Sequence, residues 1–565
     1  MDSAPLPDLD SLDRQALTAL LIAHRAELES KQSELASREA ELASRDAELA
    51  SRNAKLATLA TELESQKAEL VDQGRELLSR TEYIEHLKLQ VEKLRRMLYG
   101  TKSEKIILKL EQLELHLEEM ESARAELETA IEAASPEPEV QKPARKPLPE
   151  HLPREIVTHL PQGECCTECG GQLRQFGEDV SEQLEYIPEN FKVIRHVRPK
   201  FACAGCDRVV EAPAPSRPVE RGIAGPALLA HVLISKYADH LPLYRQSEIY
   251  ARQGVDIGRS TLAGWVGAAT ELLAPLLAAL EKHVMSGSKL HADDTPIPVL
   301  SPGSGKTKTG RLWTYVRDDR PGGEDTAPAV WFAYSEDRKG EHPRRHLKNF
   351  HGALQADAYA GFHHLYGDGD IYEVACWAHA RRKFHEIHVL HASPTTTQAL
   401  ERIGALYAIE EQIRGKPAEL RREVRQTRAR PLLDEFQKWM EKALRSLSPK
   451  SETAAAIRYA FSRWRALTRY VDDGHLEIDN SAAERALRVV ALGRKNYLFA
   501  GSDAGGDRAA AFYSLIGSAK LNGLDPEHYL RTVLARVADH PVKKIAELLP
   551  WNLADARPKD ENKAA

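Results

Sequence analysis

Three acidic residues occupy positions that suit metal-assisted chemistry. Asp293 ends the apolar run KLHAD, and Asp357 ends the similar run GALQAD. Glu484 lies further along the chain in IDNSAAERALRVV, which has the spacing of a short helix. Carboxylates that reach one point from two strand ends and a helix can hold a pair of divalent cations. The pattern predicts a two-metal site, and the cations around Glu484 point to phosphodiester chemistry on DNA.

Each of these carboxylates also has a simpler structural explanation. Glu484 could pair with Arg488 at i, i+4 on the same helix, and Asp357 could be a turn residue at a strand end. Asp294 directly follows Asp293, so spacing alone does not say which of the two would bind a metal. The three positions become informative when they are taken together.

Basic side chains crowd the segment after Glu484. Cations of this kind neutralise the phosphate backbone and set the register of a protein on DNA. We therefore expect backbone contacts from Arg485, Arg488, Arg494 and Lys495.

Two CxxC pairs are spaced as zinc knuckles. Cys166 and Cys169 form the first pair, and Cys203 and Cys206 form the second. Four thiolates close the coordination shell of one structural zinc ion, with no position left for water. Disulfides are the alternative, although they are rare in a reducing cytoplasm. Cys165 could replace Cys166 by sequence alone.

The segment 244–266 has the pattern of helix, turn and helix. The first helix is RQSEIYARQG, the break falls around residues 254–258, and the second helix starts near Arg259 or Ser260. A helix that begins with Arg259, Ser260 and Thr261 would present cationic and hydroxyl side chains where recognition helices meet DNA. An ordinary structural helix pair is the alternative.

Leucine recurs every seven residues from Leu21 to Leu77, and the series continues through Ile84 and Val91 to Leu98. A strict seven-residue repeat of this length predicts a left-handed coiled coil, because a straight helix would drift off the seam. The other seam position is often polar, as at Gln32, so a solvated single helix stays open as an alternative. Pairing would make the protein a homo-oligomer.

Charge is divided unevenly along the 565 residues. Residues 1–139 carry 18 Lys and Arg against 30 Asp and Glu, whereas residues 140–565 carry 60 against 54. The basic remainder permits nucleic-acid binding. We expect a cytoplasmic protein without a membrane partner, since the first residues lack a signal peptide and no apolar run approaches about 18 residues.

Composition and periodicity divide the chain into successive regions of a multidomain α+β protein. The proline-rich stretch SPEPEVQKPARKPLPEHLP is expected to be an unfolded spacer. The predicted regions are a coiled coil (1–133), a linker (134–158), a zinc-binding domain (159–218), a helix-turn-helix region (219–285), a catalytic α/β part (286–391), a helical insertion (392–472), a second catalytic part with the C-terminal region (473–550) and a tail (551–565).

Many segments from about Glu92 onward resemble the DDE transposases of the insertion-sequence 66 family. The resemblance is carried by EKLRRMLYGTKSEKI, the paired CxxC knuckles, PLYRQSEIYARQGVDIGRSTLAGWV, CWAHARRKF, GRKNYLFAGSDAGGDRAAAFYSLIGSAKLNGLDP and ELLPWN. The family usually has Asp-Glu-Thr at the first acidic site. That register aligns Asp293 with the catalytic aspartate and makes Asp294 a departure. The family's CxxC register favours Cys166 over Cys165.

The resemblance implies an RNase H-like catalytic domain in which Asp293, Asp357 and Glu484 bind two Mg²⁺ ions, with Mn²⁺ as an alternative. It further implies binding to terminal inverted repeats, cleavage that frees a 3′-OH, and attack of that 3′-OH on target double-stranded DNA. Accessory proteins of the same element could take part. It also favours DNA binding by the helix-turn-helix region.

Two other classes of protein stay open from the sequence. A metal-dependent nuclease would keep the three carboxylates but show no strand transfer, and a DNA-binding regulator would not need them. Cys376 and His379 form a CxxH that also follows the second aspartate in hAT transposases. A second zinc site there would need two further ligands, so we expect His379 to be a hydrogen-bonded structural residue.

Overall fold

The computed structural model describes residues 14–98, 113, 116–128, 131, 147–161, 163–187, 190–219, 222–301, 306–357, 359–367, 369–496 and 500–555. The chain divides into two compact units, Met1–Leu78 and Ser79–Ala565, which are described separately.

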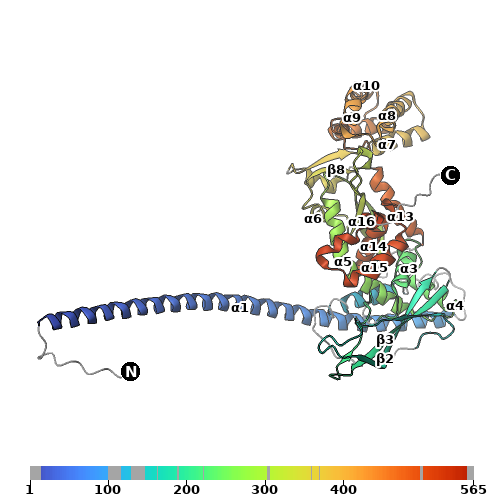
Figure 1. Ribbon diagram of the computed structural model, residues 1–565. Coiled ribbons are helices and arrows are strands. Elements are labelled where there is room, and N and C mark those ends of the chain that lie inside the picture. The colour runs from blue at the N-terminus through green and yellow to red at the C-terminus, as the bar shows by residue number, and fades with distance from the viewer. Residues whose placement is uncertain are drawn as a thin grey trace, which may run out of the picture. The chain divides into compact units, whose positions relative to one another are not determined.

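The first unit contains most of α1 (Arg14–Leu98), a single helix of 85 residues (Figure 1). Leucines of the seven-residue series lie on its surface, with exposed fractions between 56% for Leu49 and 67% for Leu21. Salt bridges between residues four apart, such as Arg38 with Glu34, stabilise the polar faces. The helix is as the repeat predicts, and the pairing of chains stays a prediction.

In the second unit, the end of α1 packs on a further helical segment, residues 116–128. Ile84, Leu87 and Val91 form a small core with Leu117. The segment 116–128 is tied to the rest of the unit by buried charges, including a 2.6 Å salt bridge between Glu119 and Arg508. The coiled-coil region expected over 1–133 thus ends in a helical pair that belongs to the second unit.

The cysteine domain is a long β-hairpin with short flanking strands. Strands β2 (Leu173–Ile187) and β3 (Asn190–Cys203) pair antiparallel, and β4 (Val209–Val210) pairs with β3. Strand β1 (Arg154–Thr158) adds to the other side of β3 in parallel. The boundary of the predicted linker 134–158 is therefore wrong at its end, because residues 154–158 pair with β3.

Three helices follow: α3 (Pro226–Tyr237), α4 (Leu243–Arg252) and α5 (Arg259–Met285). Their apolar side chains join one core with the five-stranded sheet of residues 289–375, so they do not form a separate hydrophobic centre. Helix α5 has the length and composition of a membrane span, contrary to the expectation that no apolar run approaches this length. Half of its most apolar window is buried inside the protein.

The five-stranded sheet has the strand order β7-β6-β5-β8-β9. Its strands are β5 (Lys289–Ser301), β6 (Lys306–Arg317), β7 (Ala329–Ser335), β8 (Gly352–Ala356) and β9 (Ile371–Ala375). Strands β5, β6 and β7 pair antiparallel, whereas β5, β8 and β9 run parallel. The short helix α6 (Glu341–His346) lies between β7 and β8 in the chain. Parallel strands next to each other bring their carboxyl ends to the same edge.

Helices α13 (Ser481–Asn496) and α14 (Asp503–Leu521) pack on this sheet, and α15 (Pro526–Arg536) packs on α3. The C-terminal helix α16 (Pro550–Asp555) contacts α14. Gly517 allows α14 to approach β7 closely, because a Cβ at this position would lie 2.6 Å from Val330 Cγ1. The C-terminal helices thus cover the strands that carry the site.

Between β9 and α13 the chain is helical. Helix α7 (Trp377–Leu390) follows β9. It is continued by α8 (Pro394–Ile413), α9 (Ala418–Val424), α10 (Arg430–Ser446), α11 (Glu452–Ser462) and α12 (Trp464–Thr468). These helices form a second core around Trp377 and Phe436, at the end of the sheet away from α15 (Figure 1). The block does not interrupt the strand order.

Candidate active site

Asp293 and Asp357 come together because β5 and β8 are parallel neighbours. The parallel pairing ends at Ala292 opposite Ala356, so each aspartate immediately follows a paired residue. The expectation that Asp293 ends its strand is wrong. Strand β5 continues to Ser301 because TPIPVL goes on pairing with β6 after β8 has ended.

The environment of Asp293 is electrostatically unusual. Burial, together with the charges of Asp357, Asp294 and Glu484, raises the pKa of the Asp293 carboxyl to about 7. The backbone amide of Asp294 donates to Asp293 Oδ1 at 2.7 Å and opposes this shift. Negative charge therefore collects at this edge of the sheet, which favours a bound cation.

The start of α13 is fixed against the sheet by two buried side chains that the sequence reasoning missed. Asn480 donates from Nδ2 to the carbonyl of Ala292 at 2.8 Å, and its Oδ1 lies 3.1 Å from Nδ1 of His291. Gln355 donates to the carbonyl of Glu477 at 2.8 Å. These bonds tie the residues before Glu484 to β5 and β8. The only sequence feature that indicates the start of this helix is the N-capping pattern DNS before AAER.

Glu484 itself lies in the first turn of α13, and its backbone amide donates to the carbonyl of Asn480. Its Oε1 is 3.7 Å from Nδ1 of His379. The helix buries Ala483, Leu487 and Val490. Asp293, Asp357 and Glu484 are not among the groups of described residues whose ligand atoms all lie within 4.8 Å of one another.

Asp294 has a different role from its neighbour. Successive side chains of a strand point to opposite faces, and the Asp294 side chain is only 1% exposed. It accepts from Arg311 at 3.0 Å and from Arg338 at 2.7 Å. Both carboxylate oxygens are thus satisfied by arginines. Arg338 Nη2 also lies 3.8 Å from Asp357, so it links Asp294 to the candidate site.

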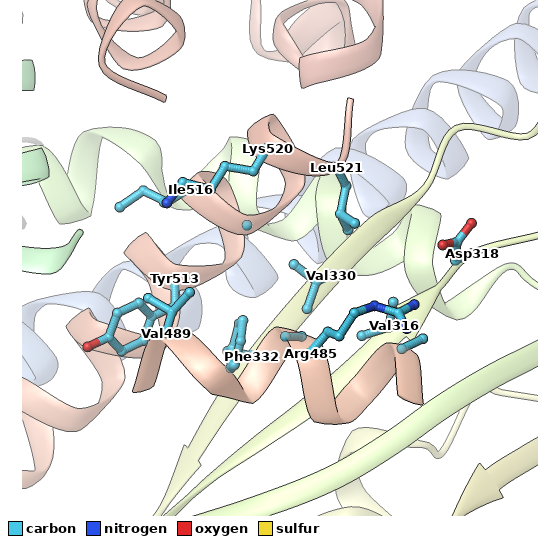
Figure 2. Close-up of a pocket in the computed structure, with 13 residues that line it drawn as sticks. Val316, Asp318, Val330, Phe332, Arg485, Val489, Tyr513, Ile516, Lys520 and Leu521 are labelled. Atoms are coloured by element: carbon cyan, nitrogen blue, oxygen red, sulfur yellow. The ribbon is translucent and has the colours of Figure 1, made fainter. Parts of the chain in front are cut away.

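The cations expected to contact DNA fall into two groups. Arg485 and Arg488 are exposed on α13. Arg485 also borders an apolar pocket of about 250 Å³ between α13, α14 and the sheet, where Figure 2 shows it extending toward Val316 and Asp318. The side chains of Arg494 and Lys495 lie outside the part of the chain that the structure describes.

Helix α5 begins at Arg259, as the helix-turn-helix pattern predicted. Ser260 and Thr261 are exposed at its first turn. Arg259 is different, because its side chain is 17% exposed and its Nε lies 3.7 Å from Glu121. The geometry thus turns Arg259 toward a buried carboxylate, whereas the two hydroxyl groups face solvent.

The four predicted cysteines form one cluster. The sulfur of Cys169 lies 3.4 Å from that of Cys203 and 3.3 Å from that of Cys206, and Cys166 lies 3.7 Å from Cys206. Tetrahedral zinc with bonds of about 2.3 Å places its sulfurs about 3.8 Å apart, so the cluster fits one ion after small adjustments. All four thiols are free, and Cys165 is outside the group. The hairpin explains the convergence, because β2 and β3 begin and end beside the two knuckles.

Cys376 and His379 lie beside Glu484, at the N-terminal end of α7. The hydrogen bond expected for His379 is absent at Nδ1, which is buried and has no partner among the described residues. Cys376 Sγ accepts the backbone amide of Asn480 at 3.2 Å. Burial raises the pKa of the Cys376 thiol to about 12.

Comparison with known protein families assigns a class to this arrangement. The family described as "Transposase IS66 family", a DDE type, matches residues 221–508. The "zinc-finger binding domain of transposase IS66" matches residues 164–207, which contain the cysteine cluster. "Transposase C of IS166 homeodomain" matches residues 86–157, and the "IS66 C-terminal element" matches residues 514–551. The fold and site are therefore those of a DDE transposase.

The chain belongs to the IS66 family of transposases, with zinc-finger, leucine-zipper-like and DDE domains. It is similar to two proteins of Sinorhizobium fredii (strain NBRC 101917 / NGR234). It is 42% identical to "Uncharacterized protein y4hP" over 82% of this chain and 88% of that protein. It is 38% identical to "Uncharacterized protein y4qI" over 83% and 89%, respectively. Membership implies DNA cleavage and strand transfer.

Proposed function

We propose that this transposase binds the terminal inverted repeats of its own insertion sequence, cleaves there to free 3′-OH ends, and joins those ends to target DNA. The observation that supports the proposal is geometric: Asp293 and Asp357 directly follow paired residues of the parallel neighbours β5 and β8, and the residues before Glu484 are hydrogen-bonded to the same two strands. The strand order β7-β6-β5-β8-β9, with three antiparallel and two further parallel strands, supports an RNase H-like domain.

Asp293, Asp357 and Glu484 are the proposed catalytic residues. Their donors are all carboxylate oxygens, which suit Mg²⁺ or Mn²⁺ better than softer metals. Excess negative charge around Asp293 supports cation binding in the same place. When bound, two such ions would activate the attacking oxygen and stabilise the leaving oxygen. The chain's own part is to hold the carboxylates on two strands and a helix, with Asn480 and Gln355 as positioning residues.

Phosphate contacts are assigned to exposed groups near this edge and on α5. Arg485 and Arg488 form no salt bridge with any residue of the described ranges, so their charge is available to a DNA backbone. Ser260 and Thr261 offer hydroxyl donors at the start of α5. The cysteine cluster is proposed to hold one structural Zn²⁺ that keeps the hairpin ends together.

A strand-transfer assay distinguishes this function from its alternatives. The full-length protein is incubated in Mg²⁺ with precut terminal repeats that carry a 3′-OH and with supercoiled target DNA. We expect joined products, whereas a simple nuclease would yield only cut DNA and a regulator would yield neither.

The variant Asp357→Asn tests the site in the same assay. It removes the charge that holds a cation while keeping the size of the side chain, so joining should fall at least about a hundredfold with repeat binding nearly unchanged. Asp370→Asn, in the exposed turn before β9, is the matched control and should behave as the parent. Parental joining by Asp357→Asn would refute the assignment.

A further inference from the structure

Cys376, His379 and Glu484 form a second group of potential metal ligands beside the carboxylate site. Their ligand atoms all lie within 4.8 Å of one another. Cys376 caps α7, His379 lies in the first turn of that helix, and Glu484 enters from the first turn of α13. The third ligand that the CxxH pattern lacked in the sequence thus comes from a distant helix.

Two of these ligand atoms are buried without hydrogen-bond partners among the described residues. They are Nδ1 of His379 and Oε1 of Glu484, and they face each other at 3.7 Å. That distance is too long for a hydrogen bond. Two ligands bound at about 2.0 to 2.1 Å to one tetrahedral ion lie about 3.3 Å apart, so the gap would fit a shared metal ion after a small adjustment.

The donor types restrict which metal would bind. A thiolate sulfur, an imidazole nitrogen and a carboxylate oxygen suit Zn²⁺ and similar transition metals, whereas Mg²⁺ prefers oxygen donors alone. Three protein ligands also leave one position open, as in catalytic zinc sites. The amide of Asn480, which donates to Cys376 Sγ, would orient the sulfur and stabilise its charge.

We propose that Cys376, His379 and Glu484 bind a second transition-metal ion of the Zn²⁺ class, next to the ions of the carboxylate site. Glu484 is the shared ligand, with Oε1 toward His379 and its second oxygen available to the ion beside Asp293. The inference rests on the proposed function only through this shared residue. It makes the catalytic centre one of mixed metal type.

Metal content tests the proposal without reference to activity. The full-length protein is purified under reducing conditions without chelator, dialysed against trace Zn²⁺, and analysed for zinc per chain. We expect two equivalents in the parent and one in Cys376→Ser and in His379→Asn. Cys165→Ser, which alters a cysteine outside both groups, should keep two equivalents.

Cobalt spectroscopy shows which site has lost its ion. With Co²⁺ in place of zinc, the knuckle site gives the bands of four thiolate ligands, and the proposed site adds a component with a single thiolate. The added component should disappear in His379→Asn while the four-thiolate bands remain, which also shows that the variant is folded. One equivalent in the parent, or an unchanged second equivalent in both variants, would overturn the proposal.

The two hypotheses fail separately in these experiments. Mg²⁺-dependent joining of ends by a protein that binds only one zinc would leave the proposed function intact and remove the second site. Two zinc equivalents in a protein that joins no ends would support the second metal site and contradict the proposed function.

Discussion

At the scale of single residues, the raised pKa of Asp293 makes stability and metal binding depend on pH. Its folded-state pKa of about 7 lies above the ordinary value of 3.8, because the carboxyl is buried among other acidic groups. The stabilising contribution of its proton is fully present below the unfolded-state pKa and is lost as pH rises through about 7. Metal binding must displace this proton at low pH.

We therefore expect Mg²⁺ to raise the melting temperature of the protein more at pH 8 than at pH 6. Below pH 7, metal affinity at this carboxyl should fall about tenfold per pH unit, since the proton competes for it. Thermal melts with and without Mg²⁺ at both pH values measure the effect. Equal shifts at the two pH values, or an undiminished pH difference in Asp293→Asn, would contradict the assignment.

Residue types and spacing indicated a candidate metal site, but they did not show which of two neighbouring residues would take part in it. Adjacent Asp293 and Asp294 could not be separated by spacing, and the structure separates them because a strand turns neighbours to opposite faces. Asn480 and His291 were missed because their function depends on a contact between residues almost two hundred positions apart. Propensities and periodicity carry no information on such a contact.

At the scale of elements, the helical segment 116–128 fits against α5 through two glycines. A Cβ on Gly267 would lie 2.2 Å from the carbonyl oxygen of Ser122 and 2.8 Å from the amide of Glu126. A Cβ on Gly264 would lie 3.8 Å from Ala125, an ordinary contact. The backbones are therefore closest at Gly267.

These two positions give a matched pair of variants. Gly267→Ala should lower the free energy of unfolding by about 1 to 3 kcal/mol, because overpacking outweighs the gain in helix propensity. Gly264→Ala should be neutral or stabilising by up to about 1 kcal/mol, since alanine is the better helix former. Denaturant unfolding followed by circular dichroism measures both. Equal behaviour of the two variants would show that the segment does not dock here.

Local patterns predicted where elements begin better than where they end. Helix α5 begins at Arg259, and the strands that begin at 289 and 352 coincide with the starts of the runs KLHAD and GALQAD. Strand β5 outlasts Asp293 because it continues to pair with β6, and residues 154–158 form a strand because they pair with β3. The residue at which a strand begins or ends depends on its partner strand, so the sequence of the segment alone does not specify it.

At the scale of the whole molecule, the exposed leucine stripe of α1 leads us to propose that chains associate. A single helix has no surface of its own on which to bury Leu35, Leu42 and Leu49, each at least 56% exposed. Association would also hold the two ends of an element together.

Three lysines on the stripe test this proposal in the full-length chain. The triple variant of Leu35, Leu42 and Leu49 to Lys should lower the molar mass measured by light scattering after size-exclusion chromatography at micromolar concentration. The control is a triple variant with lysine at Ser37, Ser44 and Ser51, which lie two positions beyond each leucine and away from the seam. This control protein should have the parental molar mass. A parental protein that is monomeric would contradict the proposal.

The placement of Asp357 and Glu484 near enough to Asp293 to influence its pKa is a long-range feature that local patterns could not supply. Asp357 and Glu484 are separated by the whole block from α7 to α12, and only the resemblance to a family gave their order a meaning. The structure adds the physical links, with β5 parallel to β8 and Asn480 joining α13 to β5.

The strand-transfer rate of Glu484→Gln tests the central claim most directly, because Glu484 is the ligand that reaches the site from the farthest element. The substitution keeps the length and shape of the side chain and removes its charge. With precut ends, target DNA and saturating Mg²⁺, joining should fall at least about a hundredfold, while the melting temperature and binding to the terminal repeats stay close to parental. Joining within a few-fold of the parental rate would show that Glu484 is not part of the active site.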